Sequence, residues 1–370
     1  MQKYLSDKNE TNLRLPGPVP VPFDILNEQT KPLINHRGNE YSYLLKNCTD
    51  KLKQIFATDN DLYITTSSGT GVMEASISNF LSEGDEIIVA SVGWFGDRFT
   101  EIAQAYNVKV INLSFSHGSN INCTDLEECI KKNPKAKAVY VTHNETSTGV
   151  QNNLSDISKI VTKYSLLFVV DGISSVASVP CETDKLKIDV LISASQKGWV
   201  TPPGLAFISV SKKAWNYHKV SSLPKYYFDI SQYKNYFKKG QPPFTPAIGV
   251  MYSLDKALDL LIEETMPKVY ERHKKVAYKI RTKLIEIGFE LFPDDENHAS
   301  DTLTSVKIPK ETSTKQIIEK LEKKYNVIIS AGQGNLSDKI LRIGHLGLVS
   351  DAEIDWLIES LIKSMEKENE

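Results

Sequence analysis

The chain has 370 residues, which is enough for two or three domains of ordinary size. Hydrophobic residues make up 41% and charged residues 24%, a composition that is typical of globular proteins and argues against disorder or low-complexity structure. The 44 basic and 46 acidic residues leave a net charge of −2, so the basic surface of a nucleic-acid-binding protein is not expected.

Apolar stretches are short throughout the sequence. Residues 166–170 are among the longest, whereas a membrane-spanning helix needs about 20 apolar residues. The first residues are polar and have no apolar signal-peptide core. The four cysteines are too few for a disulfide framework. We therefore expect a cytoplasmic protein without a membrane partner.

Residues 1–20 are polar and then rich in proline, which predicts an extended arm rather than a packed element. Short β-branched runs then alternate with helix-length patterns such as 72–81 and 154–164. The predicted strands are residues 62–65, 86–90, 109–113, 138–142, 166–170, 189–192 and 205–210. This alternation predicts an α/β fold with a mostly parallel central sheet and helices on both faces.

The pattern changes near residue 250. Residues 251–287 predict a long helix that breaks or kinks at Pro267. The elements predicted after it are a strand at 304–308, a helix at 314–324, strands at 327–330 and 339–343, and a helix from Asp351. We therefore expect an arm (1–20), a large domain (21–250) and a smaller C-terminal α+β domain (251–370), with the two domains packed tightly.

The first candidate for ligand binding follows strand 62–65, because open parallel sheets bind ligands beyond the carboxyl ends of their strands. There Ser67-Ser68-Gly69-Thr70-Gly71 leads into a helix. A helix start offers free N–H groups and a positive dipole end, which suit a phosphate. No Gly-Lys-Ser/Thr follows, so this is not a Walker loop. Taken alone, an ordinary turn before a helix explains the pattern equally well.

A second candidate is Asp171, which follows the apolar run 166–170. An acid at the end of a buried strand is unfavourable unless a cation pairs with it. A helix N-cap or a metal ligand would also explain the residue, but no histidine or further carboxylate at short spacing supports a metal site. The remaining interpretation is an acid that faces a protonated ring nitrogen.

A third candidate is Lys197 in Ser195-Gln196-Lys197-Gly198, because residues 190–196 and 198–208 carry no charge. A solvated surface lysine is the ordinary alternative. A desolvated lysine has a lowered pKa and can act as a nucleophilic amine that forms a Schiff base. Together the three candidates fit pyridoxal phosphate, which also needs an aromatic side chain against its ring. Trp94, after strand 86–90, is placed to be that aromatic plate.

With these residues in view, the sequence resembles the class V (fold type I) pyridoxal-phosphate aminotransferases, and within them the alanine–glyoxylate and serine–pyruvate group. The resemblance covers nearly the whole chain in consistent order. The motifs that carry it are Leu15-Pro16-Gly17-Pro18, Ser67-Ser68-Gly69-Thr70, His143-Asn144-Glu145-Thr146-Ser147-Thr148-Gly149, Val169-Val170-Asp171, Ser195-Gln196-Lys197-Gly198 with Pro202-Pro203-Gly204, and Leu341-Arg342-Ile343-Gly344-His345-Leu346-Gly347.

The resemblance implies a role for each matching residue. Lys197 would be the catalytic lysine that carries the cofactor. The other cofactor-binding residues would be Ser68, Gly69, Thr70 and Gln196 at the phosphate, Asp171 at the ring nitrogen, and Trp94, Thr146 and Ile173 around the ring. Gly17 would lie near the substrate, and Arg342 would bind its α-carboxylate through a planar guanidinium. No metal is expected.

Members of the family are homodimers, so the resemblance implies that Thr245 reaches the active site of the neighbouring subunit. Pro242 stands where some members supply a tyrosine to the phosphate, and that hydrogen bond is then absent or made elsewhere. Arg37 either binds a second acidic group on the substrate or pairs with Glu40 at the surface.

The implied activity is a ping-pong transamination from alanine or serine to glyoxylate or pyruvate. Aspartate, phosphoserine, 2-aminoethylphosphonate and ureidoglycine stay open as donors. A cysteine desulfurase shares the fold, but it would need a cysteine near residues 310–340, a stretch that has none, and it usually has histidine in place of Gln196. A cofactor-binding regulator without turnover would lack the lysine or the arginine, or would add a DNA-binding segment, and neither feature is seen.

Overall fold

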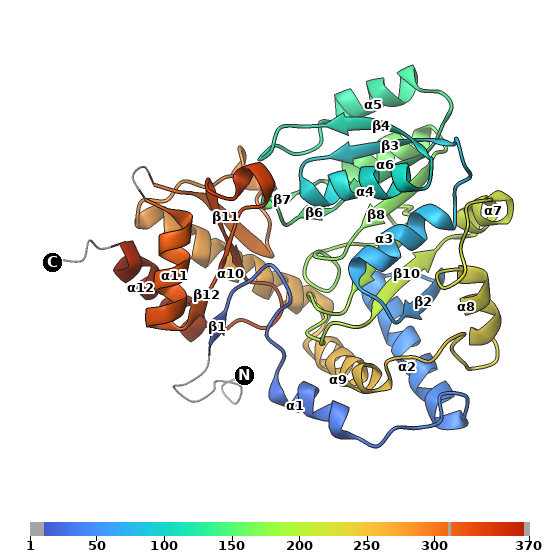
Figure 1. The fold of residues 1–370 in the computed structure, drawn as a ribbon, viewed down its shortest axis with the longest axis horizontal. Coiled ribbons are helices and arrows are strands. Elements are labelled where there is room, and N and C mark those ends of the chain that lie inside the picture. Colours follow the sequence, from blue (N-terminus) through green and yellow to red (C-terminus); the bar gives the residue numbers. More distant parts are fainter. Residues whose placement is uncertain (1–10, 310–311, 366–370) are drawn as a thin grey trace.

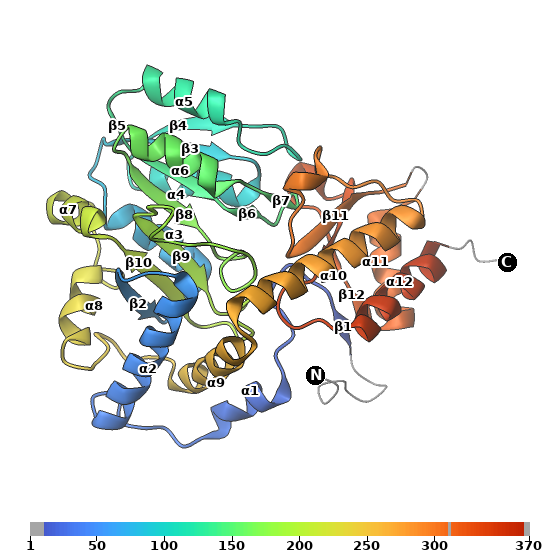
Figure 2. The ribbon, with the colours of Figure 1, turned by 180° about the vertical axis from the view of Figure 1, so that it is seen from behind.

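The computed structural model describes residues 11–309 and 312–365. Within these residues the chain forms a larger unit around a seven-stranded sheet and a smaller unit around a three-stranded sheet. The long helix α10 (Met266–Glu286) runs from the larger unit into the smaller one (Figures 1 and 2). No helix in the described part of the chain is both long and apolar enough to span a membrane.

The large sheet has the strand order β2-β10-β9-β8-β5-β3-β4. Its strands are β2 (Asp61–Thr65), β3 (Glu86–Ser91), β4 (Lys109–Ser114), β5 (Ala136–Thr142), β8 (Leu167–Asp171), β9 (Val190–Ala194) and β10 (Ala206–Val210). All seven predicted strands are thus confirmed. Only β10 runs antiparallel to its neighbours. Its connection to β9 is the loop 195–205, which is too short for the crossover helix that parallel strands usually need.

Helices cover both faces of this sheet, as predicted. They are α2 (Asn39–Phe56), α3 (Gly69–Ser78), α4 (Trp94–Ala105), α5 (Cys123–Lys132), α6 (Leu154–Lys163), α7 (Lys212–Val220), α8 (Ile230–Phe237) and α9 (Ile248–Glu264). In β8, Phe168 and Val170 join the apolar cluster of α2, α5, α6 and α9, whereas Leu167 and Val169 join the cluster of α3 and α4. All four side chains are fully buried, which explains the continuous apolar run.

The predicted helix 251–287 is two helices, α9 and α10, which meet at Thr265. Pro267 lies in the first turn of α10, where its missing N–H costs no helical hydrogen bond. The break therefore comes two residues before the proline rather than at it. Since α9 packs against α2 and α10 packs against the smaller unit, the packing partners change at Thr265. The domain boundary at residue 250 stays a prediction.

The smaller unit has its own sheet in the order β11-β14-β13 and its own apolar core. Its elements are β11 (Leu303–Lys307), α11 (Thr314–Tyr325), β12 (Val327–Ile328), β13 (Ser330–Ala331), β14 (Ile340–Gly344) and α12 (Asp351–Met365), with short 3₁₀ turns at Glu296–His298 and Gly334–Leu336. The predicted strand 327–330 is divided between β12 and β13.

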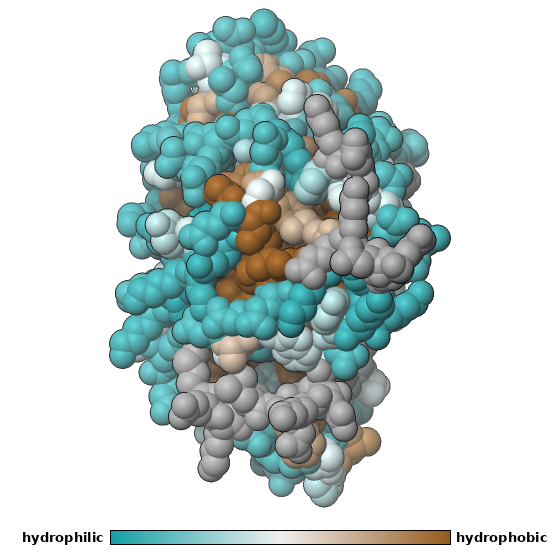
Figure 3. All heavy atoms as spheres, turned by 90° about the vertical axis from the view of Figure 1, so that its left-hand side faces the viewer, coloured by the Kyte–Doolittle hydropathy of each residue, from teal (hydrophilic) through white to brown (hydrophobic). Residues whose placement is uncertain are grey.

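The side of the molecule that carries this unit shows an apolar patch surrounded by polar side chains (Figure 3).

The amino-terminal arm is extended but packed, contrary to the prediction that it is not a packed element. Its strand β1 (Asn12–Leu13) pairs in parallel with β12 of the smaller unit (Figure 1). Arg14 is only 1% exposed, and its buried charge is paired with Glu353. The arm then crosses to the larger unit, where α1 (Phe23–Asn27) and the 3₁₀ turn Glu28–Thr30 follow. Residues 1–10 of the predicted arm lie outside the described residues.

Candidate active site

The site lies where the carboxyl ends of the parallel strands meet. Asp171 is the last residue of β8 and pairs with Ile192 of the neighbouring strand β9. The loop after β9 carries Lys197, and the charges of Lys197 and Asp171 each shift the pKa of the other. The topology thus brings together two residues that are 26 positions apart in sequence.

The start of α3 forms an open anion cradle beside these two residues. Its N-cap residue, Ser68, makes no side-chain capping hydrogen bond, so the first N–H groups of the helix are available to a ligand. A Cβ at Gly69 would lie 2.7 Å from Cδ1 of Ile173, so the missing side chain lets Ile173 pack against the helix start. Arg98 lies within 3.4 Å of the Thr70 hydroxyl and adds positive charge. This arrangement suits a phosphate.

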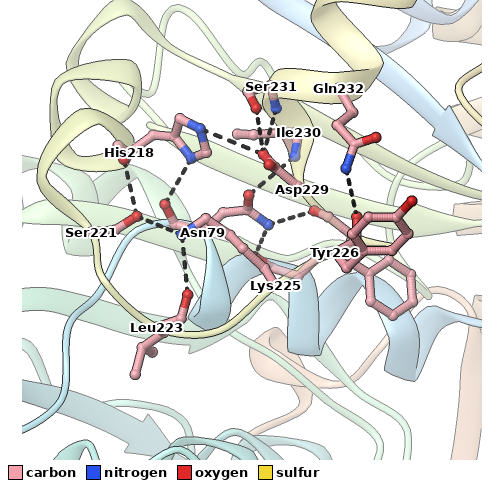
Figure 4. A network of polar contacts seen from close by, with 12 residues as sticks. Asn79, His218, Ser221, Leu223, Lys225, Tyr226, Asp229, Ile230, Ser231 and Gln232 are labelled. Carbon is pink, nitrogen blue, oxygen red and sulfur yellow. Dashed lines mark hydrogen bonds and ion pairs between the residues drawn. The ribbon is translucent and has the colours of Figure 1, made fainter.

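The position of α3 is fixed at both of its ends. At the C-terminal end, the buried Asn79 donates to the carbonyl of Phe228 and accepts from the N–H of Ile230, at the centre of the network in Figure 4. At the other end, the Tyr227 hydroxyl donates to the carbonyl of Thr66 at 3.0 Å. The segment between α7 and α8 therefore anchors the cradle.

Asp171 is 4% exposed, and one of its carboxylate oxygens accepts a hydrogen bond from the N–H of Ile173 at 2.8 Å. Burial raises the pKa of Asp171 to about 7, against the opposing effects of that hydrogen bond and of the Lys197 charge. A cation placed next to the carboxylate would hold it in the ionised form. A protonated pyridine nitrogen is such a cation.

The amine of Lys197 donates to the carbonyl oxygen of Pro16 in the arm at 2.6 Å. Burial lowers the pKa of Lys197 to about 8, and the positive charge of Arg342 lowers it further, while Asp171 acts in the opposite direction. The neutral, nucleophilic amine is therefore accessible near neutral pH. Gly17 has a φ of +128°, and a Cβ there would lie 2.5 Å from Nζ of Lys197, so only glycine allows the arm to pass this close.

Arg342 on β14 is 8% exposed, and it is held by the carbonyls of Ala331 at 2.7 Å and Thr146 at 2.9 Å. Burial lowers its pKa to about 10, and the negative charge of Glu145 opposes that effect. Within residues 11–309 and 312–365, no carboxylate forms an ion pair with Arg342. A buried guanidinium without an acidic partner is suited to bind the carboxylate of a ligand.

Glu145 is a central residue that the sequence reasoning did not assign. One of its carboxylate oxygens accepts from the N–H groups of Phe95 and Gly96 at the start of α4, at 3.0 and 3.1 Å. The other oxygen accepts from the N–H and the hydroxyl of Ser147, at 3.0 and 2.6 Å. The Ser147 hydroxyl in turn accepts from the N–H of Trp94. One buried carboxylate thus joins α4 to the short hairpin of β6 (Asn144–Glu145) and β7 (Val150–Gln151).

Two aromatic side chains begin α4. Trp94 is 43% exposed and lies against Gly334 of the smaller unit, where a Cβ would be 2.9 Å from its ring. Phe95, which the sequence reasoning did not weigh, lies under the guanidinium of Arg98, 4.7 Å from the centre of its ring. The role of Trp94 as the aromatic plate stays a prediction, and Phe95 is a second candidate for it.

The remaining predicted residues fall into two places. Thr146 and Gln196 lie in the site, and the side-chain oxygen of Gln196 is buried without a hydrogen-bond partner. Thr245 is exposed on the segment after α8. Arg37 donates to Gln241 at 3.3 Å and lies over the ring of Tyr236, and it makes no ion pair with Glu40 between these described residues.

The residues present fit pyridoxal phosphate. The start of α3 is open to an anion, and Asp171 has the buried, partly satisfied carboxylate that a protonated ring nitrogen needs. Lys197 offers an amine of lowered pKa at the same strand edge. The unpartnered oxygen of Gln196 and the unpartnered ring nitrogen Nδ1 of His143 are further buried polar atoms that a ligand could satisfy.

Comparison with known proteins agrees with this chemistry. The chain matches the family model "Aminotransferase class-V" over residues 26–346. It is 31% identical to the serine–glyoxylate aminotransferase of Methylorubrum extorquens (93% of this chain, 88% of the relative) and 38% identical to a protein named soluble hydrogenase 42 kDa subunit from Anabaena cylindrica (94% and 91%). The solved structure of the alanine–glyoxylate aminotransferase of Nostoc sp. superposes with a TM-score of 0.93 at 25% identity (99% and 98% of the two chains).

The family match covers more than half of the chain, and the Nostoc structure has the same α/β architecture of fold type I as this chain. Members of this family depend on pyridoxal phosphate and act on small amino and oxo acids. The chain belongs to the class V aminotransferases and is a pyridoxal-phosphate-dependent aminotransferase.

Proposed function

We propose that the protein transfers an amino group from alanine or serine to glyoxylate or pyruvate by a ping-pong mechanism. The observation that carries the proposal is the buried Arg342, which has positive charge and no acidic partner among the described residues. It lies close enough to Lys197 for its charge to lower the pKa of that lysine. The two relatives named as glyoxylate aminotransferases support the choice of acceptor.

When bound, pyridoxal phosphate supplies an aldehyde that condenses with amines and a protonated ring that withdraws electrons from the substrate Cα. In the proposed site, the helix start at Ser68, Gly69 and Thr70 would hold the phosphate, together with Gln196. Asp171 would keep the ring nitrogen protonated, because the buried carboxylate and the ring cation would stabilise each other's charges. The ring would be contacted by Ile173, Trp94 and Thr146.

The remaining residues act on the substrate. Arg342 orients the α-carboxylate through two parallel hydrogen bonds, as a planar guanidinium can. The amine of Lys197, once released, moves the proton at the substrate Cα. Its pKa of about 8 is suited to this, because a base that is too strongly protonated at the working pH cannot accept a proton. The backbone of Gly17 in the arm lies against the end of the Lys197 side chain.

A screen of half-reactions tests the proposed substrates. Amino acids are added one at a time to the holoenzyme without an oxo acid, and the visible absorbance of the cofactor is followed. We expect alanine or serine to remove the band and glyoxylate or pyruvate to restore it. A response to aspartate, phosphoserine, 2-aminoethylphosphonate or ureidoglycine alone would replace the proposed donor. No response to any amino compound would contradict transamination by this protein. That outcome would matter because the chain also resembles a protein named as a hydrogenase subunit.

We further propose a homodimer in which Thr245 reaches the active site of the second copy. The large apolar side chains of the larger unit that are at least 74% exposed, which is unfavourable in a monomer, include Phe23, Leu33, Tyr43 and Tyr226. These four belong to α1, α2 and the segments next to α2 and α8 along the lower and right-hand border in Figure 1. Sedimentation should give twice the 41.5 kDa mass of one chain. A fully active monomer would contradict the proposal.

A further inference from the structure

The arm between β1 and α1 connects the smaller unit directly to the amine of Lys197. At its start, the N–H of Arg14 donates to the carbonyl of Ile328 at 2.7 Å, and the carbonyl of Arg14 accepts from the N–H of Gly344 at 2.7 Å. Gly344 is the last residue of β14, the strand that carries Arg342. At its end, the N–H of Val19 donates to the carbonyl of Gln196, next to the lysine, at 3.1 Å. The arm is therefore tied to both units.

Between these two ties, the arm touches the catalytic amine. The carbonyl oxygen of Pro16 accepts the hydrogen bond of Lys197 Nζ at 2.6 Å, and the backbone of Gly17 lies against the end of the lysine side chain. Only one residue, Leu15, separates Arg14 from Pro16. Because only this one residue intervenes, we expect a shift of Arg14 to displace the carbonyl that Lys197 uses.

Arg14 is held in place by a buried ion pair with a carboxylate that is itself fixed by hydrogen bonds. Its guanidinium is buried and lies 2.8 Å from a carboxylate oxygen of Glu353 in the first turn of α12. The other oxygen of Glu353 accepts from both the N–H and the hydroxyl of Ser350 at 2.8 Å, which fixes the carboxylate. Asn12 adds a hydrogen bond to the carbonyl of Glu353 at 2.7 Å. A buried charge with one fixed partner is costly to disturb, so this anchor sets the position of the arm.

We propose that Arg14, through its ion pair with Glu353, is a positioning residue that holds the Pro16 carbonyl and the backbone of Gly17 against the amine of Lys197. The arm keeps water away from the amine and gives it one fixed acceptor. This inference rests on the proposed role of Lys197 and adds a remote residue that controls it. It also links the strand of Arg342 to the lysine through a single backbone segment.

The test is the pH dependence of acetylation at Lys197 in the full-length chain freed of cofactor. Short pulses of acetic anhydride modify only neutral amines, and mass spectrometry of the Lys197 peptide gives the midpoint pH of labelling. The charged groups that face the amine, Asp171 at the end of β8 and Arg342 on β14, are unchanged in every variant. The wild-type midpoint should lie near 8, because burial holds the pKa of Lys197 at about 8.

For Arg14→Met we expect the midpoint to rise by roughly one pH unit toward the ordinary value of lysine, because released arm residues let water reach the amine. Arg14→Lys keeps the charge opposite Glu353, so its midpoint should stay close to the wild-type value. Glu353→Gln should raise the midpoint in the same direction, and it decides the question if Arg14→Met does not fold. The matched control Glu359→Gln, an exposed acid on the same helix, should leave the midpoint unchanged.

Unchanged midpoints in a folded Arg14→Met protein or in Glu353→Gln would overturn the inference, and so would an equal shift in Glu359→Gln. The labelling does not require turnover. A protein that shows the predicted midpoint shifts but no half-reaction would therefore contradict the proposed function and leave the role of Arg14 standing. A protein that shows a half-reaction but no midpoint shifts would contradict only the role of Arg14.

Discussion

Replacing Lys197 with alanine should abolish transamination, with a loss of about 10⁴-fold or more, the upper end of what a positioned acid–base group contributes. The loss is this large because the same amine would hold the cofactor and move the proton at the substrate Cα. The structure supports one group in both tasks, since burial keeps the pKa of the amine at about 8 and Asp171 lies at the same strand edge. Single-turnover kinetics with alanine or serine would measure the loss.

The matched control for this variant is Lys212→Ala. Lys212 is an exposed lysine at the start of α7, away from the strand edge that carries Lys197. It should keep wild-type turnover and the wild-type visible band. Lys197→Ala should lack the band that borohydride removes from the wild-type protein. Wild-type turnover by Lys197→Ala would refute the assignment of this lysine.

Removing the guanidinium of Arg342 should have the second-largest effect. For Arg342→Ala we expect kcat/KM for amino acids to fall roughly 30- to 5,000-fold, which corresponds to a loss of about 2–5 kcal/mol in transition-state stabilisation. The reason is that the substrate carboxylate would be left without its charged partner in a buried place. Arg342→Lys should fall in between, since an ammonium keeps the charge but cannot form two parallel hydrogen bonds. Most of the change should appear in KM.

Two controls separate binding of the carboxylate from loss of structure. Gln333→Ala removes a neutral neighbour that lies 3.4 Å from Arg342, and it should change KM little. Ethanolamine, which is serine without its carboxylate, should react equally slowly with the wild-type protein and with Arg342→Ala. An unchanged KM for amino acids in a folded Arg342→Ala protein would remove Arg342 from the substrate site.

The fold of the larger unit could be predicted because its signals are local. Each strand is a short apolar run, and the run ending at Val170 is continuous because Phe168 and Val170 face one apolar cluster while Leu167 and Val169 face the other. The antiparallel direction of β10 could not be seen in this way. It depends on the short connection after β9, whose consequence for strand direction appears only once the strands are paired.

The site was predictable where a residue contrasts with its sequence neighbours. Lys197 stands alone in an uncharged stretch, and Asp171 ends an apolar strand. Glu145 and Arg14 carry no such contrast. Their roles depend on partners that are distant in sequence: the N–H of Phe95, 50 residues away, and the carboxylate of Glu353, 339 residues away. The proline-rich arm likewise gives no local sign that its residues pack against β12.

The central claim is that Lys197 and Asp171 act at opposite ends of one cofactor ring. Borohydride reduction of the holoenzyme, followed by digestion and mass spectrometry, tests this claim most directly, because it identifies the lysine to which the cofactor is attached. A crystal structure of the reduced protein then shows where the ring nitrogen lies relative to Asp171. The account predicts that the reduced cofactor is attached to Lys197, with its ring nitrogen within hydrogen-bond distance of the Asp171 carboxylate. Attachment to any other lysine, or a ring nitrogen that faces away from Asp171, would contradict it.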